Sequence, residues 1–526
     1  MKIILTLAMM PGLLIAFAGA QQGYESIQQK ALQADVWFFS APEMAGRKAA
    51  SNESRIATNY IASEFLRLGL KPQGDEGSYF QNFDLTLAAQ DDAHVALTVR
   101  QKGVEKSYAL GHDFDLTWIT QTTNPTTVSA PVVFLGHGIH APEYGYDEFA
   151  NLDLHGKIVI ILPHEPQERD AASKFKGKWH TYHAYDQLKY EEIRKAGAVG
   201  ILEVIEKTPH RPATVSSAPR QDWFPEAVYS LPEYWDLPVF EITEELANQL
   251  LSGSGKTVDL LHHEIDSDLK PHGFELSGVN VTMSKAYTNR RVVTARNVLG
   301  LLEGSDSKLK DEYVVISAHH DHLGVVAGRT QYGADDNASG EAGLLEIARA
   351  FATSGVRPKR SILFASFDSE EEGMLGSFYY AKHPEVPLNQ TVAVLNMDMI
   401  GSNEDSPTWP LEKAWTAQSV NLVGTRYSPD LRHIAEQANA RLHLNMDFKT
   451  DEEDREEWLA RSDQYVFVTQ GIPAILFNTG EHSDYHTEND TWDKLNYPKL
   501  EKITRLIYLT AVQVANSVDR PRFDVH

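Results

Sequence analysis

The feature that most constrains the fold is an alternation of apolar, strand-like runs with helix-like segments from Val292 onwards. The expected strands are 313–317, 361–367, 392–397 and 474–477, and the expected helices are 340–352, 375–381, 429–439 and 499–515. This alternation predicts a parallel sheet with helices on both faces. We therefore expect an α/β three-layer sandwich with a mostly parallel central mixed sheet.

The first part of the chain has a different character. A pair of amphipathic helices is expected over 28–69, and strand-like runs follow it. Residues 129–290 change character, with strand-like runs and no metal-ligand signature. The resemblance described below implies that they form a mainly β domain inserted into the first. The expected domains are 21–128 and 291–526 as the two parts of the sandwich domain, with 129–290 as the inserted domain.

Residues 1–20 are typical of a cleaved signal peptide. Lys2 precedes an apolar stretch, and Ala18-Gly19-Ala20 supplies small residues before Gln21. A membrane anchor is the alternative, but Pro11 and Gly12 interrupt the stretch, which falls short of the ~20 residues that span a bilayer. We expect a secreted or periplasmic protein with no membrane partner after cleavage.

Composition limits both the partners and the ligands. The chain has 73 acidic and 48 basic residues, a net charge of −25, which argues against nucleic acid and anionic membranes as partners. It has no cysteine, so disulfides and thiolate metal ligands are excluded. Histidine and carboxylate side chains remain as the strong metal ligands.

Five short signatures along the second half are rich in these ligands. They are His319-His320-Asp321-His322, Asp335-Asp336-Asn337, Glu370-Glu371-Glu372, Asn396-Met397-Asp398 and Asp484-Tyr485-His486. Most follow an expected strand end, where open α/β sheets place their sites. Two imidazoles and three carboxylates can hold two zinc ions if one carboxylate bridges them. The expected ligands are His319, Asp335, Glu371, Asp398 and His486, with Asp335 as the bridge.

Each signature also has a simpler interpretation. The histidine cluster could be a polar loop, the Asp335 segment a turn that caps a helix, and the glutamate run a solvated surface. Within the cluster, the H-x-D spacing favours His319 as ligand and Asp321 as the group that orients it, while His320 and His322 remain alternatives. A charge at Asp398 inside an apolar strand requires a metal, Arg or Lys partner.

The same signatures contain candidates for catalysis. We expect Glu370 to act as general base, taking a proton from a zinc-bound water and delivering it to a leaving amine. Tyr485 could direct its phenol at a developing oxyanion. His482 is expected to support the site, and Asp463 is a candidate to receive a substrate amine.

Together, AHHDHLG, GADDNASG, DSEEEGMLGS, LNMDMIG and SDYHTENDT resemble the co-catalytic zinc exopeptidase family that includes bacterial leucyl-type aminopeptidases and glutamate carboxypeptidase. The resemblance covers most of residues 30–125 and 290–515, and 129–290 is similar to a protease-associated domain. It implies one zinc on His319, Asp335 and Asp398, and the other on Asp335, Glu371 and His486. It also implies Glu370 as base and a cis Asp335–Asp336 peptide, which places Asp336 beside the metals.

The function expected from this resemblance is a secreted dizinc aminopeptidase that releases N-terminal residues from peptides through a zinc-bound hydroxide. We expect a monomer, because too few residues follow His486 for the helical dimerisation domain of glutamate carboxypeptidases. The alternatives are a glutaminyl cyclase-like transferase with one zinc, a carboxypeptidase or dipeptidase of the same family, and a non-catalytic binding protein. Glu372 stands where the family usually has an apolar residue, which leaves the register of Glu370 and Glu371 open.

Overall fold

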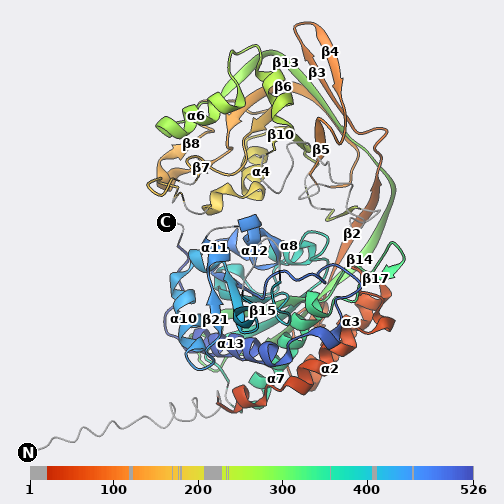
Figure 1. Cartoon of the computed structure of the whole chain (residues 1–526), viewed down its shortest axis with the longest axis vertical. Coiled ribbons are helices and arrows are strands. Elements are labelled where there is room, and N and C mark those ends of the chain that lie inside the picture. The colour runs from red at the N-terminus through yellow and green to blue at the C-terminus, as the bar shows by residue number, and fades with distance from the viewer. Residues whose placement is uncertain are drawn as a thin grey trace, which may run out of the picture. The chain divides into compact units, whose positions relative to one another are not determined.

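The structure is a computed structural model. It describes residues 21–524 apart from 118–121, 169, 176, 178–179, 206–227, 233, 235, 356, 406–411 and 453–454, so the predicted signal peptide lies outside the described residues. The chain divides into two compact units (Figure 1). Among the described residues, unit 1 comprises 21–83 and Thr294–Asp524, and unit 2 comprises Asp84–Val293.

The core of unit 1 is a mixed, mostly parallel sheet. From β14 onwards, the strands of this ten-stranded sheet are, in spatial order, β14 (Tyr287–Leu302), β18 (Ser361–Phe367), β15 (Tyr313–His319), β19 (Thr391–Met397), β22 (Ala474–Asn478), β20 (Ser419–Val423) and β21 (Asn445–Asp447). β15 runs parallel to β18 and β19, and β19 runs parallel to β22. β14 and β20 pair antiparallel with their neighbours β18 and β22. The mixed α/β sandwich predicted from the sequence is therefore present in unit 1.

Helices cover both faces of this sheet. The longer helices are α2 (Gln29–Phe39), α3 (Asn52–Arg67), α7 (Gly340–Thr353), α8 (Leu375–Lys382), α10 (Pro429–Asn439), α12 (Gln464–Val468) and α13 (Tyr497–Asn516). Phe364 of β18 contacts aromatic rings of α3 and α7, whereas Phe367 contacts rings of α8 and α12. Side chains three apart on a strand point to opposite faces, so α3 and α7 lie on one face and α8 and α12 on the other. Figure 1 shows α2, α7 and α13 together, and these helices contact one another.

Helix ends in unit 1 follow local sequence signals. The hydroxyl of Ser51 accepts a hydrogen bond from the first turn of α3, and Ser428 does the same for α10, which begins with Pro429. The Asn496 side chain caps α13 in the same way. Such caps satisfy amide groups that a helix leaves without partners. The predicted start of α10 at residue 429 is confirmed, and α13 begins two residues before the expected 499. In the part of the chain that the structure describes, no helix combines the length and apolar character needed to span a bilayer.

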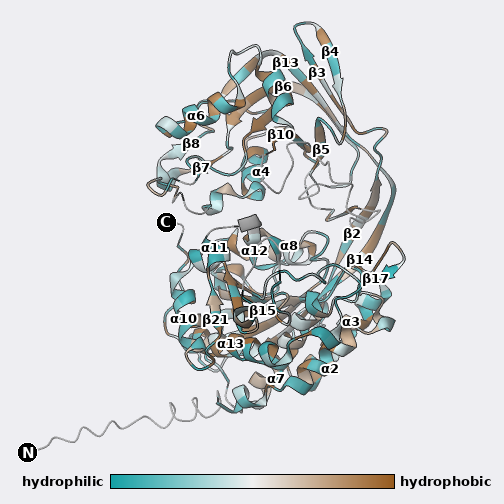
Figure 2. Ribbon diagram, viewed as in Figure 1, coloured by the Kyte–Doolittle hydropathy of each residue, from teal (hydrophilic) through white to brown (hydrophobic). Residues whose placement is uncertain are grey.

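Unit 2 is built on an eight-stranded sheet. Its order is β4 (Val104–Tyr108), β3 (Ala96–Gln101), β13 (Phe274–Lys285), β6 (Thr126–Gly136), β9 (Ile158–Ile161), β10 (Gly200–Val204), β12 (Val239–Ile242) and β5 (Phe114–Leu116). Its helices are α4 (Asp186–Lys195), α5 (Glu244–Leu251) and α6 (Val258–Asp268). Separate apolar clusters include Val132 and Ile160 in one and Val133 and Val159 in the other, as strand alternation requires. Figure 2 shows brown, apolar stretches along the ribbon of this sheet.

The boundary of unit 2 differs from the expected inserted domain. The sequence analysis placed its start at residue 129, whereas the compact unit begins at Asp84. The reason is that β3 pairs along most of its length with the long strand β13, which joins the 84–128 segment to the rest of the unit. β13 was not predicted, although its valine and methionine residues alternate with serine, threonine and asparagine, a pattern typical of a half-buried strand.

Truncation of Phe364 tests the packing of unit 1. Phe364 is fully buried against aromatic rings of two helices. Phe364→Ala should lower the free energy of unfolding of this unit by about 3–5 kcal/mol, measured by urea unfolding followed by circular dichroism. Val518 is 75% exposed, so Val518→Ala should change the same quantity by less than about 0.5 kcal/mol. Equal effects of the two substitutions would contradict the packing described.

Candidate metal centre

Four strands of unit 1 end at segments that carry metal-binding side chains. β15 ends at His319, and Asp398 directly follows β19. The acidic run 370–372 follows β18, and the loop with His486 follows β22. β15, β18, β19 and β22 are parallel, so their carboxyl ends lie at one edge of the sheet, where α/β sheets place their sites.

The first ligand group contains His319, Asp336 and Asp398. The Nε2 atom of His319 lies 3.5 Å from Oδ1 of Asp336 and 3.3 Å from Oδ1 of Asp398. All three side chains are buried. Among the described residues, His319 Nε2 and Asp398 Oδ1 have no hydrogen-bond partner of acceptable geometry. Buried polar atoms normally have partners, and a cation between these two atoms would satisfy both.

The second ligand group contains His322, Asp336, Glu371 and His486, with one ligand atom of each within 4.8 Å of the others. The Nε2 atom of His486 lies 2.9 Å from Oδ2 of Asp336 and 3.3 Å from Oε2 of Glu371. The Nδ1 atom of His322 lies 2.5 Å from the other oxygen of Glu371. Asp336 therefore turns one carboxylate oxygen toward each group.

This geometry corrects the predicted bridge by one residue. Asp335 joins neither group, because its Oδ1 accepts a hydrogen bond from the amide of Gly401 at 2.7 Å and its Oδ2 lies 3.3 Å from His482 Nε2. Asp336, which the sequence analysis placed only beside the metals, occupies the shared position. The cis peptide is Asp336–Asn337, again one residue later than expected.

The histidine cluster separates into three different environments. His319 lies in the first ligand group and His322 in the second. The Nδ1 atom of His320 instead lies 2.8 Å from the hydroxyl of Ser366, inside the core. Asp321 lies with its Oδ1 3.6 Å from His319 Nδ1, in reach of the imidazole that it was expected to orient.

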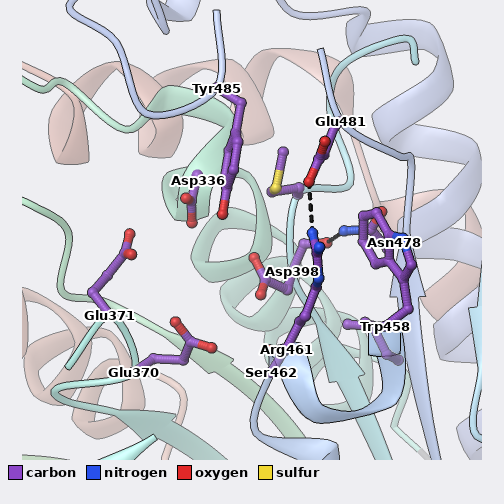
Figure 3. Close-up of a pocket in the computed structure, with 12 residues that line it drawn as sticks. Asp336, Glu370, Glu371, Asp398, Trp458, Arg461, Ser462, Asn478, Glu481 and Tyr485 are labelled. Carbon is purple, nitrogen blue, oxygen red and sulfur yellow. Dashed lines mark hydrogen bonds and ion pairs between the residues drawn. The ribbon is translucent and has the colours of Figure 1, made fainter. Parts of the chain in front are cut away.

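Asp321 also positions the glutamate run. Its two carboxylate oxygens accept hydrogen bonds from the backbone amides of Glu370 at 3.0 Å and Glu371 at 3.3 Å. Glu370 and Glu371 both line the pocket at the ligand groups (Figure 3). Glu372 points elsewhere and forms an ion pair with Lys48 at 3.0 Å. The sequence left open which two glutamates of the run face the site. In the structure they are Glu370 and Glu371.

Tyr485 and Asp463 differ in their relation to the pocket. The ring of Tyr485 stacks on His486, and its hydroxyl end points between Asp336 and Asp398 (Figure 3). Tyr485 therefore lies where a group facing substrate is expected. Asp463 is fully buried and is not among the residues that line the pocket. The geometry therefore does not favour Asp463 as the group that receives a substrate amine.

Negative charge dominates the electrostatics of the site. Burial opposes the charged form of His486, but Glu371 and Asp336 outweigh it and raise its pKa to about 10. Burial likewise opposes charge on His319, yet Asp398 and Glu370 raise its pKa well above the ordinary value. Both imidazoles respond to an excess of carboxylates, which is the environment that attracts a cation.

Two supporting residues were not predicted. Asp490 accepts hydrogen bonds from the amides of Asp335 and Asp336, as Asp321 does for the glutamate pair. Arg47 is fully buried and donates to the carbonyls of His320 and Gly333. Asp490 lies within the motif SDYHTENDT, and Arg47 lies within the expected helix pair over 28–69. No pattern of spacing distinguishes either residue from its polar neighbours.

Fold and site together define a class: an α/β sandwich protein with two adjoining metal-ligand groups that share one carboxylate. Residues 297–511 match the family described as Peptidase family M28. The predicted resemblance to an exopeptidase family of aminopeptidases and glutamate carboxypeptidases is confirmed over this segment.

The chain is also similar to individual members of known sequence. It is 25% identical over 245 residues to the aminopeptidase YwaD of Bacillus subtilis (strain 168), covering 45% of this chain and 48% of that protein. It is 34% identical over 142 residues to the mouse (Mus musculus) aminopeptidase NAALADL1, covering 26% and 18%. The chain therefore spans less than half the length of these relatives.

Among solved structures, the chain is similar to an aminopeptidase from Aneurinibacillus sp. strain AM-1. The two are 20% identical with a TM-score of 0.47, and the comparison covers 96% of this chain and all of the other.

Removal of the Arg47 guanidinium tests the support of the site. Arg47→Met keeps the apolar stem but leaves buried carbonyls without donors, at about 1–3 kcal/mol for each unsatisfied group. We expect the free energy of unfolding of unit 1 to fall by about 3 kcal/mol or more, measured by urea unfolding. Arg67 is 73% exposed in its ion pair, so Arg67→Met should cost less than about 1 kcal/mol. An Arg47→Met variant as stable as Arg67→Met would contradict this role.

Proposed function

We propose that the protein is a zinc-dependent aminopeptidase with two metal ions. One ion would be held by His319, Asp336 and Asp398, and the other by Asp336, Glu371 and His486. The observation that carries the proposal is the Asp336 carboxylate, which directs Oδ1 to the first group and Oδ2 to the second. Of the two ligand types, only a carboxylate can bind both ions, because a neutral imidazole has a single free lone pair.

The residues present fit zinc. The donor set is imidazole nitrogen and carboxylate oxygen, which zinc accepts readily. The buried, unpartnered atoms His319 Nε2 and Asp398 Oδ1 would both be satisfied by an ion between them. His322 would donate to the outer oxygen of Glu371 and so fix the direction of the inner one, as groups behind a metal ligand commonly do.

Glu370 is the residue best placed to move protons. Bound zinc would supply Lewis acidity and activate a water for attack on a peptide carbonyl. Glu370 Oε2 lies 3.9 Å from His319 Nε2, next to the ligands but in neither group. Burial raises the pKa of Glu370 well above its ordinary value, which makes its carboxylate a better proton acceptor. The hydroxyl of Tyr485 would donate a hydrogen bond to the developing oxyanion.

The charges of the pocket favour an amino-terminal over a carboxyl-terminal substrate end. Arg461 is the cation among the described residues that line the pocket, and it forms an ion pair with Glu481 at 2.6 Å. A carboxypeptidase needs a cation to receive the terminal carboxylate, whereas a peptide amine suits a pocket whose charged lining residues are mainly carboxylates. Names of the relatives support the same choice, since two of them are called aminopeptidases.

The remaining expectations are part of the proposal. A glutaminyl cyclase-like transferase with one zinc is disfavoured because both ligand groups are complete. Export rests on the sequence of residues 1–20, and peptides as substrates rest on the site chemistry. A monomer remains the proposed state.

The register of the bridge can be tested by matched substitutions of adjacent residues. Asp336→Asn removes a shared ligand, so the zinc bound per chain should fall by two ions relative to the wild type after dialysis, because neither group keeps its bridging carboxylate. Asp335→Asn changes a residue bonded to Gly401 and should retain the zinc of the wild type. Inductively coupled plasma mass spectrometry of the purified proteins measures both.

The opposite result for the pair, with zinc lost from Asp335→Asn alone, would restore Asp335 as the bridge. Circular dichroism spectra of both variants should match the wild type, which separates metal loss from unfolding. Loss of one zinc per chain, and not two, between the wild type and Asp336→Asn would favour the cyclase alternative.

The role of Glu370 can be tested by a second matched pair. Glu370→Gln removes the proposed base without removing a metal ligand, so kcat on aminoacyl anilides should fall by about 10²–10⁴-fold with zinc retained. Glu372→Gln changes only the ion pair with Lys48, and its kcat should stay within about threefold of the wild type. Equal activities of Glu370→Gln and the wild type would exclude the mechanism.

A further inference from the structure

A second cluster of metal-ligating side chains lies in unit 2, far along the chain from the centre described above. His164, Glu168 and His180 each place one ligand atom within 4.8 Å of the others. All three belong to the loop between β9 and α4. Neither the family match, which covers 297–511, nor the proposed peptidase chemistry involves these residues.

One carboxylate serves both imidazoles in this cluster. The Nδ1 atom of His164 lies 3.1 Å from Oε2 of Glu168, and the Nε2 atom of His180 lies 3.2 Å from Oε1 of the same side chain. The two imidazole rings are tilted against each other with their centroids 4.2 Å apart. Three donors from separate parts of the loop therefore converge on one small volume.

The loop holds these donors in place through neighbouring residues. The Glu165 carboxylate accepts hydrogen bonds from the backbone amide of Thr181 at 3.0 Å and from its hydroxyl at 2.5 Å. This contact joins the residue after His164 to the residue after His180. Gln167, next to Glu168, bonds to Asp266 of α6 through its backbone amide at 2.6 Å and its side chain at 2.8 Å. The donors are thus positioned from both sides before any ligand arrives.

A double ion pair of Glu168 with two charged imidazoles accounts poorly for this arrangement. If Glu168 were paired with two charged imidazoles, two positive rings would lie 4.2 Å apart and repel each other. A divalent metal ion removes that conflict, because both imidazoles bind it in their neutral forms and the carboxylate offsets its charge. Two His and one Glu are a ligand set found in zinc sites that leave one position open.

We propose that His164, Glu168 and His180 form a binding site for a divalent transition-metal ion, with zinc as the preferred ion. The side chain of His180 is 9% exposed and that of Glu168 is 26% exposed, so solvent reaches the site from the carboxylate side. A water molecule completes the tetrahedral coordination from that side. The ion links two parts of the loop between β9 and α4.

The site is tested by zinc content in two backgrounds. The full-length protein and its Asp336→Asn variant are each prepared with and without the double substitution His164→Asn and His180→Asn. After equilibration with micromolar zinc and gel filtration, the double substitution should remove one zinc ion per chain in both backgrounds. The Asp336→Asn comparison reports on the centre in unit 1, so failure of the peptidase proposal and failure of this one are distinguishable.

A control and a second variant complete the test. His94→Asn breaks an exposed His–carboxylate pair, His94 with Asp91 at 2.8 Å, and should leave zinc content unchanged. Glu168→Gln, nearly isosteric, should weaken zinc binding at the site by at least about tenfold even if the double variant fails to fold. X-ray absorption on zinc-loaded Asp336→Asn should show imidazole nitrogen at ~2.0–2.1 Å from the metal. Zinc contents that are equal with and without these substitutions would overturn the proposal.

Discussion

The structure of unit 1 depends on burying carboxylates at one edge of its sheet. Asp321, Asp335, Asp336, Asp398 and Asp490 are all buried there. Burying one unpaired carboxylate costs several kcal/mol, so a group of them is stable only when donors or cations face each oxygen. The loops around the site are arranged to meet that requirement, and they include residues with left-handed backbone such as Ser369, Met399 and His486.

The carboxylates meet this requirement in two ways. Asp321 and Asp490 accept hydrogen bonds from pairs of successive backbone amides and so fix the loops that carry Glu370 and Asp336. Asp336 and Asp398 instead face the imidazole of His319, and their carboxylate oxygens are the ones available to metal ions. The carboxylates that would bind metal therefore face imidazoles, whereas the carboxylates that support the loops accept hydrogen bonds from backbone amides.

Much of this centre could be predicted from the sequence. His319, Glu371, Asp398 and His486 were predicted from residue type and from their place after apolar strands, because parallel strands bring their carboxyl ends to one edge. The choice between Asp335 and Asp336 could not be made in that way. Adjacent residues in an irregular loop have no period, and Gly333 enters the loop in a left-handed conformation that redirects the side chains after it.

The limits of sequence prediction have the same physical origin elsewhere. His322 was considered only as a rival to His319, because spacing alone did not show that both could face the site. The start of unit 2 was misplaced since the pairing of β3 with β13 joins segments about 180 residues apart, and strand pairing at such separation leaves no local pattern.

Arg47 has a consequence for how the molecule is assembled. Its hydrogen bonds to His320 and Gly333 span 273 and 286 residues, with all of unit 2 intervening in the chain. During synthesis, this arginine emerges long before the carbonyls that it must reach, so the metal centre forms only after most of the chain exists. A fragment limited to the family segment 297–511 would lack this guanidinium, and with it the tie between the histidine loop and the aspartate loop.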